Sequence, residues 1–497
     1  MKHRSYTILL TVTCILTGCD DFLSEVPNRG GDEVLNSGAQ IDALFNNSDY
    51  LTTYAKLSLT SSDDFGYTTA VADAFGYVDS DVMNGLTWNV ESQRLVAYGD
   101  EMWNTEYSKI FLANLIINGI DEVTDITEEQ RTDYLANAHF IRALANWQLV
   151  SLYAQPYDDE TLDTPGLPLK QTTSYEEDMH RATLKDTYAF ILADLDDAYK
   201  TTRTDIGQRW LVSRPAVEAL RARIYLSMQD YKAAAAHAAE ALNSQRVRLV
   251  DYNALGTIKR TLTSMDGDIT VTYSELYGMS PIEFANYSEL YYASMYEINN
   301  NLFPSSSLLA IYDREDDLRF RLLFVENGTL SIGLEDIAED NMLYTYFAGA
   351  HGRDNMPAAP TVPEVLLTRA EALARQGQWK EGMNVLNELR TKRIRTGGHI
   401  TLTATSQEEA IRFILEERHR EMPFMMRWQD IRRLAYNETL NDDIALNRIF
   451  YKVENNTIDY GVTQKYTLPV KSKRYAQPIA DIEIVRSRKQ LIQNDYD

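Results

Sequence analysis

Glu416, Glu417 and Glu421 are the residues best placed for catalysis, because glycoside hydrolysis needs two carboxylates about 5–10 Å apart. Glu417 and Glu421 lie one turn apart on a predicted helix, in which Arg418 and Arg420 alternate with the acids. Glu416 and Arg420 have the spacing of an intrahelical ion pair. We therefore interpret this group as an ion-pair ladder that does not catalyse, and a glycoside hydrolase is the alternative.

Other catalytic and metal-binding motifs are absent from the sequence. None of the seven histidines forms His-Glu-x-x-His, and there is no Walker A loop, Gly-x-Ser-x-Gly or dinucleotide glycine pattern. Two acidic runs, 313–317 and 158–160, contain calcium-type ligands without EF-hand spacing. Such runs are usually solvated surfaces. We predict no cofactor, and calcium binding is an unsupported alternative.

The aromatic content suits a binding function, although it suits helix packing and protein contacts as well, so composition alone does not decide between them. The chain has 31 tyrosines and six tryptophans, whose flat rings can stack on sugars while amides and acids bond the hydroxyl groups. Trp88 is the leading candidate, in a predicted loop. The spacing of Tyr287, Tyr291 and Tyr292 would also suit a buried helical face. The candidate ligand contacts are Tyr67, Tyr77, Asn84, Trp88, Asn286, Tyr287, Tyr291, Tyr292 and Tyr296.

The first nineteen residues predict export and lipid attachment. A basic start, an apolar run over 6–16 and the sequence Leu16-Thr17-Gly18-Cys19 have the form of a bacterial lipoprotein signal. We expect residues 1–18 to be removed and Cys19 to carry the lipid, which would anchor the chain to a membrane. An ordinary signal peptide with an incidental cysteine is the alternative.

Net charge and hydropathy limit the classes of partner that we expect for this protein. The formal net charge is −25, and removal of Lys2 and Arg4 with the signal makes it −27, which argues against nucleic acid. The only cysteines are Cys14 and Cys19, so we predict no disulfide in the mature chain. After the signal, no run of 18 apolar residues predicts a transmembrane helix.

Helical periodicity extends over most of the chain. Thr127 and Gln130 have capping-box spacing, Pro215 suits a first helical turn, and Ser406 precedes two glutamates. The predicted helices cover residues 38–54, 100–122, 128–154, 183–202, 213–243, 362–394 and 406–436.

Two helical hairpins repeat one pattern. Residues 219–242 and 367–389, shifted by 148 positions, both contain a helix with small residues, a tight turn and an aromatic that opens a second helix. This is the tetratricopeptide pattern, with generic helical hairpins as the alternative. Hairpins at 101–122 with 131–154, and 183–202 with 213–228, fit more loosely.

The predicted fold class is mostly α: a tetratricopeptide-like helical-hairpin scaffold with an irregular, loop-rich ligand-binding insertion. Regions 55–99 and 244–360 lack helical period and are rich in Tyr, Asp, Asn, Ser and Gly. We divide the chain into a signal peptide (1–18), a lipidated tether (19–37), a helical scaffold (38–243) with a loop excursion (55–99), a ligand-binding region (244–360) and a C-terminal tetratricopeptide-like pair with a closing segment (361–497).

Short motifs follow one another in a definite order along the chain. They are Cys19-Asp20-Asp21-Phe22-Leu23, Trp103-Asn104-Thr105-Glu106-Tyr107, Ala138-His139-Phe140-Ile141-Arg142-Ala143, Pro165-Gly166-Leu167-Pro168-Leu169, Arg369-Ala370-Glu371-Ala372-Leu373, Glu417-Arg418-His419-Arg420-Glu421, Arg427-Trp428-Gln429-Asp430-Ile431-Arg432-Arg433 and Leu468-Pro469-Val470. As an ordered set they make most of the chain resemble the SusD/RagB family of nutrient-binding outer-membrane lipoproteins. Met425-Met426 departs from the acidic-glycine pair usual there, and Pro423 predicts a kink or a helix end.

The resemblance implies a binding protein rather than an enzyme. Members of the family cover a TonB-dependent (SusC-like) transporter at the cell surface, capture oligosaccharides or polysaccharides and deliver them to that transporter. Asp20 and Asp21 resemble a surface-export address, so we expect a lipid-anchored protein on the outer face of the outer membrane. The alternatives are capture of peptides or glycopeptides by the same fold, a lipid-anchored glycoside hydrolase, and a tetratricopeptide scaffold that binds only proteins.

Overall fold

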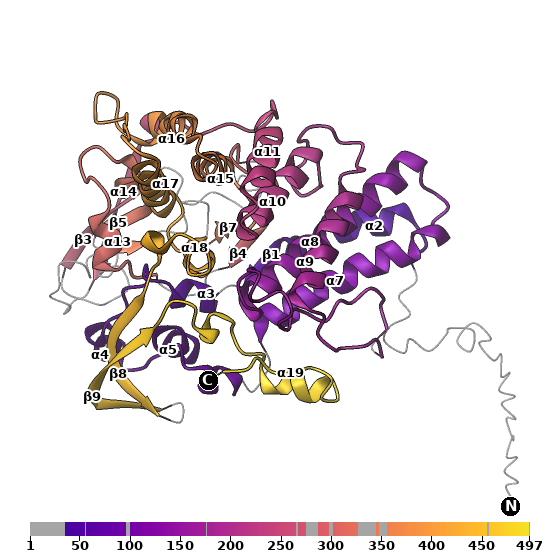
Figure 1. Cartoon of the computed structure of the whole chain (residues 1–497), viewed down its shortest axis with the longest axis horizontal. Coiled ribbons are helices and arrows are strands. Elements are labelled where there is room, and N and C mark those ends of the chain that lie inside the picture. The colour runs from indigo at the N-terminus through magenta and orange to yellow at the C-terminus, as the bar shows by residue number, and fades with distance from the viewer. Residues whose placement is uncertain are drawn as a thin grey trace, which may run out of the picture.

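The computed structural model describes residues 35–54, 56–95, 100–174, 176–264, 267–274, 287–297, 302–326, 344–346, 355–454 and 457–496. The predicted signal peptide, Cys19 and Asn286 lie outside these residues. Helices dominate the regular structure (Figure 1), as the predicted fold class requires. Within the described part of the chain, no helix has both the length and the apolar character that a membrane crossing demands.

The long helices form antiparallel hairpins, and most of their predicted limits are confirmed to within a few residues. Helices α7 and α8, α10 and α11, and α15 and α16 pack as pairs, and α9 packs on α8. Helix α11 also packs on α15, so the two repeats become neighbours despite their separation in the chain (Figure 1). The helices are α7 (Glu101–Gly119), α8 (Glu128–Tyr153), α9 (Leu184–Ala198), α10 (Arg214–Ser227), α11 (Tyr231–Leu242), α15 (Val362–Arg375), α16 (Trp379–Arg393), α17 (Gln407–Glu421) and α18 (Arg427–Leu434).

Local signals explain where these helices begin and end. Thr127 and Gln130 form the predicted capping box, and the side chain of Ser406 accepts from the backbone of Glu409. In the hairpin of α15 and α16, a Cβ on Gly382 would lie 2.6 Å from the carbonyl oxygen of Ala370, so only glycine permits this close approach. The predicted break at Pro423 is confirmed, because α17 ends at Glu421 and α18 begins at Arg427.

The prediction of one helix over 38–54 is wrong. Helix α2 (Gly38–Phe45) ends early and is followed by a 3-10 turn and strand β1 (Thr52–Tyr54). Strand β1 pairs in parallel with β4 (Met295–Glu297), which pairs antiparallel with β7 (Asn355–Pro357). The chain leaves the helical conformation here because strands from remote parts of the sequence supply backbone partners.

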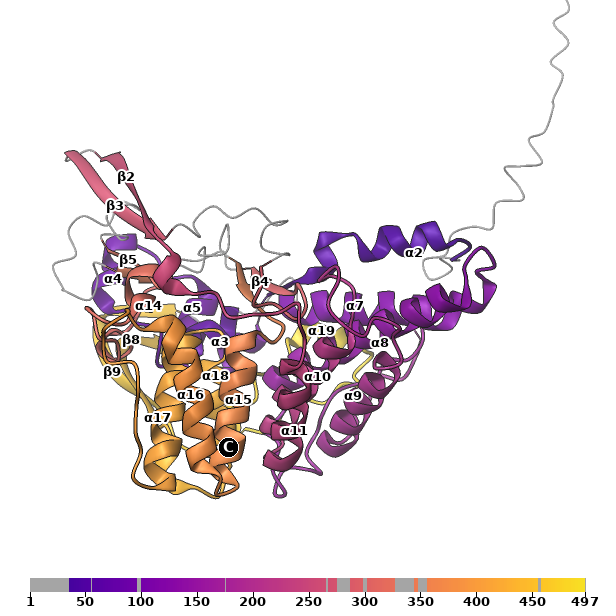
Figure 2. The same cartoon turned by 90° about the horizontal axis from the view of Figure 1, so that it is seen from above.

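The region 55–99 holds four short helices: α3 (Lys56–Ser61), α4 (Thr69–Phe75), α5 (Ser80–Thr87) and α6 (Val90–Arg94). In region 244–360, β2 (Thr257–Ser264) pairs with β3 (Gly267–Ser274), and β5 (Phe324–Glu326) with β6 (Tyr344–Tyr346). Short helices α13 (Ser306–Ala310) and α14 (Leu318–Leu323) belong to the same region. Figure 2 shows β2 and β3 projecting from the body, while α11, α15, α16 and α17 extend away from them.

The C-terminal part ends in a long hairpin of β8 (Leu446–Glu454) and β9 (Thr457–Leu468), followed by α19 (Asp481–Arg486). The hairpin lies beside α4 and α5 in both views (Figures 1 and 2). One continuous core, which includes Trp147, Trp428, Phe140 and Phe450, runs through the helical hairpins to this hairpin. The packing therefore brings an early segment of the chain against a late one.

Candidate functional site

Helix α4 places two tyrosines at the junction with the β8–β9 hairpin. Thr68 caps the first turn, and Gly76 ends the helix in the left-handed conformation with φ of 69°. Tyr67 and Tyr77 therefore flank the helix just outside its two ends. Tyr67 is half-buried, whereas Tyr77 is 66% exposed.

Six aromatic rings form a continuous row from α4 to the hairpin, which we call the ring patch: Tyr77, Phe75, Tyr67, Phe450, Tyr451 and Tyr460. Successive ring centroids are 6.3, 6.3, 6.4, 5.7 and 5.1 Å apart. Only the two ends are well exposed, Tyr77 at 66% and Tyr460 at 47%. The inner rings are partly or fully buried, so they hold the outer two in place.

An irregularity in β9 accounts for the exposure of Tyr460. Tyr451 pairs with Thr463, whereas Lys452 pairs with Asp459, so residues 460–462 have no register partner in β8. Such a bulge re-aims the side chains that it carries. Here it turns the ring of Tyr460 onto Tyr451 and leaves Val462 45% exposed.

The loop that contains Phe303 packs against the inner rings of the patch. Phe303 lies 5.7 Å from Tyr67 and 6.1 Å from Phe75, measured between ring centroids. Its carbonyl accepts a 2.7 Å hydrogen bond from the backbone of Gly66. A Cβ on Gly66 would lie 2.6 Å from the carbonyl oxygen of Pro304, so the two segments can approach only because residue 66 is glycine.

Aspartates supply the polar part of the patch. Both carboxylate oxygens of Asp73 accept from the Tyr451 hydroxyl, at 2.7 and 2.9 Å. This hydrogen bond, with burial, raises the pKa of Tyr451. Burial, with Tyr77, Tyr460 and Asp79 nearby, raises the pKa of Tyr67 well above its usual range. These phenols therefore stay protonated at neutral pH and can donate hydrogen bonds.

Of the residues predicted from sequence, the patch contains Tyr67 and Tyr77. The others within the described residues are buried: Asn84, Trp88, Tyr287, Tyr291, Tyr292 and Tyr296 are each less than 9% exposed. Because these six side chains are buried, they present no surface to a ligand in this structure, and their role as ligand contacts stays a prediction. Asn286 and Cys19 lie outside the described residues.

Trp88 lies in the turn between α5 and α6, in agreement with the predicted loop, but its ring is buried. Trp88 ends α5 in the left-handed conformation, with φ of 50°, and is 2% exposed. Its indole nitrogen donates to the Ser61 carbonyl at 3.1 Å, and the guanidinium of Arg448 lies 5.0 Å from the ring centroid. Arg448 is 360 residues away in the chain, so local sequence could not reveal this burial.

The tyrosines of segment 287–296 pack into the core without forming a helix. Tyr292 lies 4.7 Å from the ring of Phe140, and the Tyr296 hydroxyl donates to Gln148 at 2.9 Å. The segment is a turn followed by β4. The predicted shared helical face is therefore wrong, although the alternative of core packing is confirmed.

Sequence reasoning missed Tyr460, Tyr451, Phe75 and Phe303. A signal for the hairpin was present: β-branched and aromatic residues alternate on both sides of Asn455-Asn456, a turn-forming pair. The bulge that exposes Tyr460 has no comparable signal, because it depends on the register of two paired strands.

The predicted ion-pair ladder on α17 is confirmed. Glu417 is fully buried and accepts from Arg319 and Arg390, each at 2.7 Å. Glu421 accepts from Arg319 at 2.9 Å and from Arg393 at 2.8 Å. Burial opposes ionisation of Glu417, but these arginines and Arg420 outweigh it and lower its pKa. Both carboxylates are occupied by cations, so neither is placed to act on a substrate.

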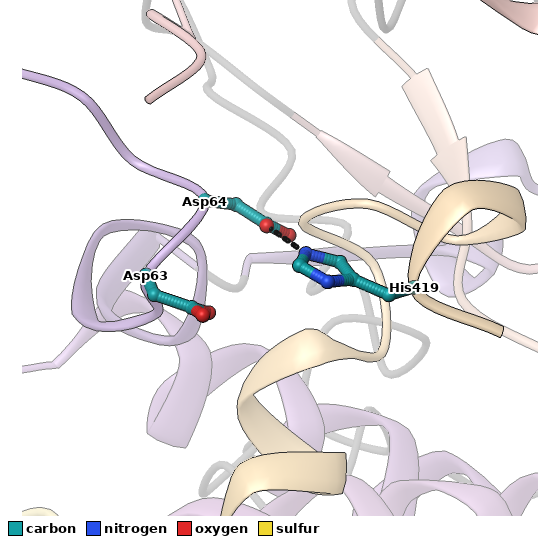
Figure 3. Close-up of side chains that lie close together, drawn as sticks. All are labelled: Asp63, Asp64 and His419. Carbon is teal, nitrogen blue, oxygen red and sulfur yellow. Dashed lines mark hydrogen bonds and ion pairs between the residues drawn. The ribbon is translucent and has the colours of Figure 1, made fainter. Parts of the chain in front are cut away.

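Asp63, Asp64 and His419 lie together where α3 meets α17 (Figure 3). His419 Nε2 is 2.5 Å from Asp64, whose other oxygen accepts from the backbone of Phe424 at 2.7 Å. Asp63 accepts two hydrogen bonds of 2.7 Å from Arg427. Metal-type ligands are present, but protein donors already satisfy them, so we interpret the group as a clamp between the two segments.

Carboxylates of the two acidic runs, 313–317 and 158–160, also have partners within the protein. Asp313 accepts from the backbone of Glu315 and Asp316, and Asp317 pairs with Arg319. In the other run, Asp158 accepts from the backbone of Glu160, which pairs with Lys471. These contacts are those of turns and ion pairs.

A cavity of about 850 Å³ lies between α17, α18 and residues 439–444. Its lining includes Glu408, Glu416, Asp442 and Asp443, and it contains no phenylalanine, tyrosine or tryptophan among the described residues. A strongly acidic cavity without these rings lacks the stacking surface that sugars require. The ring patch is therefore the better candidate for ligand binding.

The described residues thus form a tetratricopeptide-like scaffold of helical hairpins, with the ring patch where α4 meets the β8–β9 hairpin. A family model described as "Starch-binding associating with outer membrane" matches residues 21–226, and one described as "SusD family" matches residues 362–496. The chain belongs to the SusD/RagB family.

Individual relatives are consistent with this membership. SusD-like protein P2 from Formosa agariphila is 26% identical over 374 residues, covering 67% of this chain and 71% of the relative. A SusD superfamily protein from Bacteroides vulgatus has a TM-score of 0.63 at 16% identity and covers 93% of this chain and 100% of its own. Surface glycan-binding protein A from Bacteroides uniformis has a TM-score of 0.60 at 18% identity, covering 92% and 100%. The solved structures establish the fold.

Proposed function

We propose that this protein captures glycans at the cell surface with the ring patch. The observation that carries the proposal is the row of six rings whose two ends, Tyr77 and Tyr460, are exposed. Exposed tyrosines stack on the apolar faces of sugar rings, and their hydroxyls bond sugar hydroxyls. Membership of the SusD/RagB family and the glycan-binding relative from Bacteroides uniformis support the same function.

The proposal does not include catalysis. A glycosidase needs one carboxylic acid and one carboxylate with access to the scissile bond. Glu417 and Glu421, the pair closest to this requirement by sequence, are buried among arginines. Capture without cleavage is the reading that agrees with this arrangement.

Delivery to a partner is the second part of the proposal. We propose that Cys19 carries a lipid, that the protein faces the exterior of the outer membrane and that a SusC-like TonB-dependent transporter receives the ligand; membership of the SusD/RagB family supports this part. Purification from detergent-solubilised outer membranes tests this part. Absence of such a transporter from the purified material, or equal incorporation of labelled palmitate by the unaltered protein and by the Cys19→Ala variant, would contradict it.

The binding experiment uses the soluble form that begins after Cys19. Native affinity electrophoresis and calorimetry against neutral and acidic polysaccharides should show retardation by at least one polymer, without shortening of that polymer. The double variant Y77A/Y460A should lose the retardation, whereas Tyr199→Ala, at another exposed tyrosine, should keep it. Unchanged retardation of the double variant would rule out the patch. Binding of peptides but no polysaccharide would favour peptide capture.

A further inference from the structure

We infer that the ring patch favours uncharged glycans over glycans that carry uronate or sulfate groups. This inference rests on the proposed function and names the class of ligand. It follows from the charges that surround the exposed rings of Tyr77 and Tyr460. An aromatic face binds neutral and acidic sugars alike, so the neighbouring charges decide between them.

The two segments that carry the six rings, residues 65–81 and 446–468, contain more carboxylates than cations. Asp73 bonds the inner ring of Tyr451, and Asp79 lies close enough to Tyr67 to raise its pKa. Asp459 lies at the base of the bulge, where it accepts from the backbone of Gly461 at 2.9 Å. The full set is Asp73, Asp79, Asp81, Glu454 and Asp459 against Arg448, Lys452 and Lys465.

Two of the three cations are already engaged. Arg448 is held behind the patch, where it donates to the carbonyls of Thr60 and Gly85 at 2.8 and 3.0 Å and lies over Trp88. Lys452 pairs with Glu454 at 2.6 Å. Lys465, opposite Ile449 in the hairpin, is the remaining cation of these two segments. No arginine faces the rings from them, although planar recognition of carboxylate or sulfate depends on arginine.

The chain as a whole has a net charge of −25. The excess of carboxylates on the two ring-bearing segments has the same sign as the net charge of the chain, and both disfavour polyanions.

The same aspartates favour a neutral sugar. An ionised carboxylate is an acceptor without a donor, and a sugar hydroxyl is a donor that can match it. Hydrogen bonds to ionised acceptors are roughly twice as strong as neutral ones. A uronate or sulfate group at the same position would place a further negative charge beside Asp73, Asp79 or Asp459, where Lys465 is the one cation of the two segments that is neither paired with a carboxylate nor held behind the patch.

The test compares two forms of one polymer. Laminarin, galactomannan, xyloglucan and arabinoxylan serve as neutral probes, and the one that binds is also used in carboxymethylated form. At low ionic strength the charged form should bind at least about threefold more weakly, and 0.5 M salt should narrow this difference. If the charged form, alginate or polygalacturonate binds as tightly as the neutral polymer or more tightly, the inference is overturned. The proposed function would still stand.

Variants connect the discrimination to the patch. The variant D73N/D79N/D459N removes three negative charges. Each asparagine keeps a side-chain oxygen that can accept a hydrogen bond, including the one that residue 79 accepts from the backbone of Asp81. This variant should bind both forms with more nearly equal affinity. The control D121N/E128Q/E129Q removes the same charge near the start of α8, remote from α4 (Figure 1), and should discriminate like the unaltered protein. Equal discrimination by both variants would overturn the inference, and failure of every polysaccharide to bind would overturn the proposed function with it.

Discussion

Arg223 and Glu364 form a bidentate ion pair between α10 and α15, with Nε–Oε1 and Nη2–Oε2 distances of 2.7 and 2.6 Å. Both side chains are at most 2% exposed. Arg223 also donates to the Ala358 carbonyl and lies over the ring of Trp147. One arginine thus ties together the two repeats that sequence similarity identified and the β7 end of the insertion.

We expect Glu364→Ala to destabilise the protein by about 3–5 kcal/mol, because it leaves the buried charge of Arg223 without a counter-ion. Urea unfolding followed by circular dichroism measures the loss. The control is Glu416→Ala, which breaks the exposed pair with Arg412 and should cost about 0–1 kcal/mol. Equal effects of the two substitutions would show that burial of the Arg223 pair is not what stabilises it.

Single substitutions at the exposed rings should separate stacking from hydrogen bonding. Tyr77→Ala and Tyr460→Ala should each weaken glycan binding about two- to tenfold, as expected for loss of one stacked ring. The phenylalanine variants keep the ring and should lie closer to the unaltered protein. Calorimetry with the bound polysaccharide measures both, and a larger effect of Phe than of Ala would contradict stacking.

Trp88→Ala should act on stability. Removal of a fully buried tryptophan side chain costs about 3–5 kcal/mol through lost burial and the cavity left behind. The change also removes the hydrogen bond to Ser61 and the ring beneath Arg448. Urea unfolding should therefore detect a large loss, while glycan affinity of the folded fraction changes little. A lost affinity at unchanged stability would return Trp88 to the binding site.

Acid should destabilise the protein through Glu371. Burial opposes the ionisation of this carboxylate, but Arg433 and Arg375, at 2.7 and 2.9 Å, outweigh it and lower its pKa below that of an unfolded glutamate. A lowered folded-state pKa contributes stability that is present above the unfolded pKa, about 4.3, and is lost as the pH falls below it.

The measurement is the free energy of unfolding at several pH values between 7 and 3. In Glu371→Gln the group cannot titrate, so the decline below about pH 5 should be shallower than in the unaltered protein, although the variant is less stable at pH 7. An identical decline in both proteins would show that Glu371 does not couple folding to protons in this range.

Helices were predictable because their signals are local. The capping box at Thr127, the proline at 423 and the repeat of small residues depend on neighbours within one or two turns. The strand at 52–54 was missed because its partner, residues 295–297, lies more than 240 residues away. Sequence therefore identified the scaffold and missed the points where remote segments pair.

The candidate site shows the same difference between local signals, which the sequence reveals, and long-range contacts, which it does not. Tyr67 and Tyr77 were predicted because they lie among turn-forming residues in a region without helical period. Trp88 has similar neighbours, yet Arg448 and Ser61 bury it. Tyr460 shows the converse case. It is exposed because of the strand register around Thr463 and Asp459, which the neighbouring sequence does not reveal. Exposure, which decides whether a ring can bind, is a tertiary property.

The ring patch joins residues 67–77 to residues 450–460, so its two halves lie at opposite ends of the folded chain's sequence. The clamp of Asp64 with His419 likewise joins an early segment of the chain to a late one. A chain that lacks the β8–β9 hairpin could build many of its helical hairpins and still have no row of rings. Under the proposed function, the protein therefore presents its ligand-binding rings only after its early and late segments have come together.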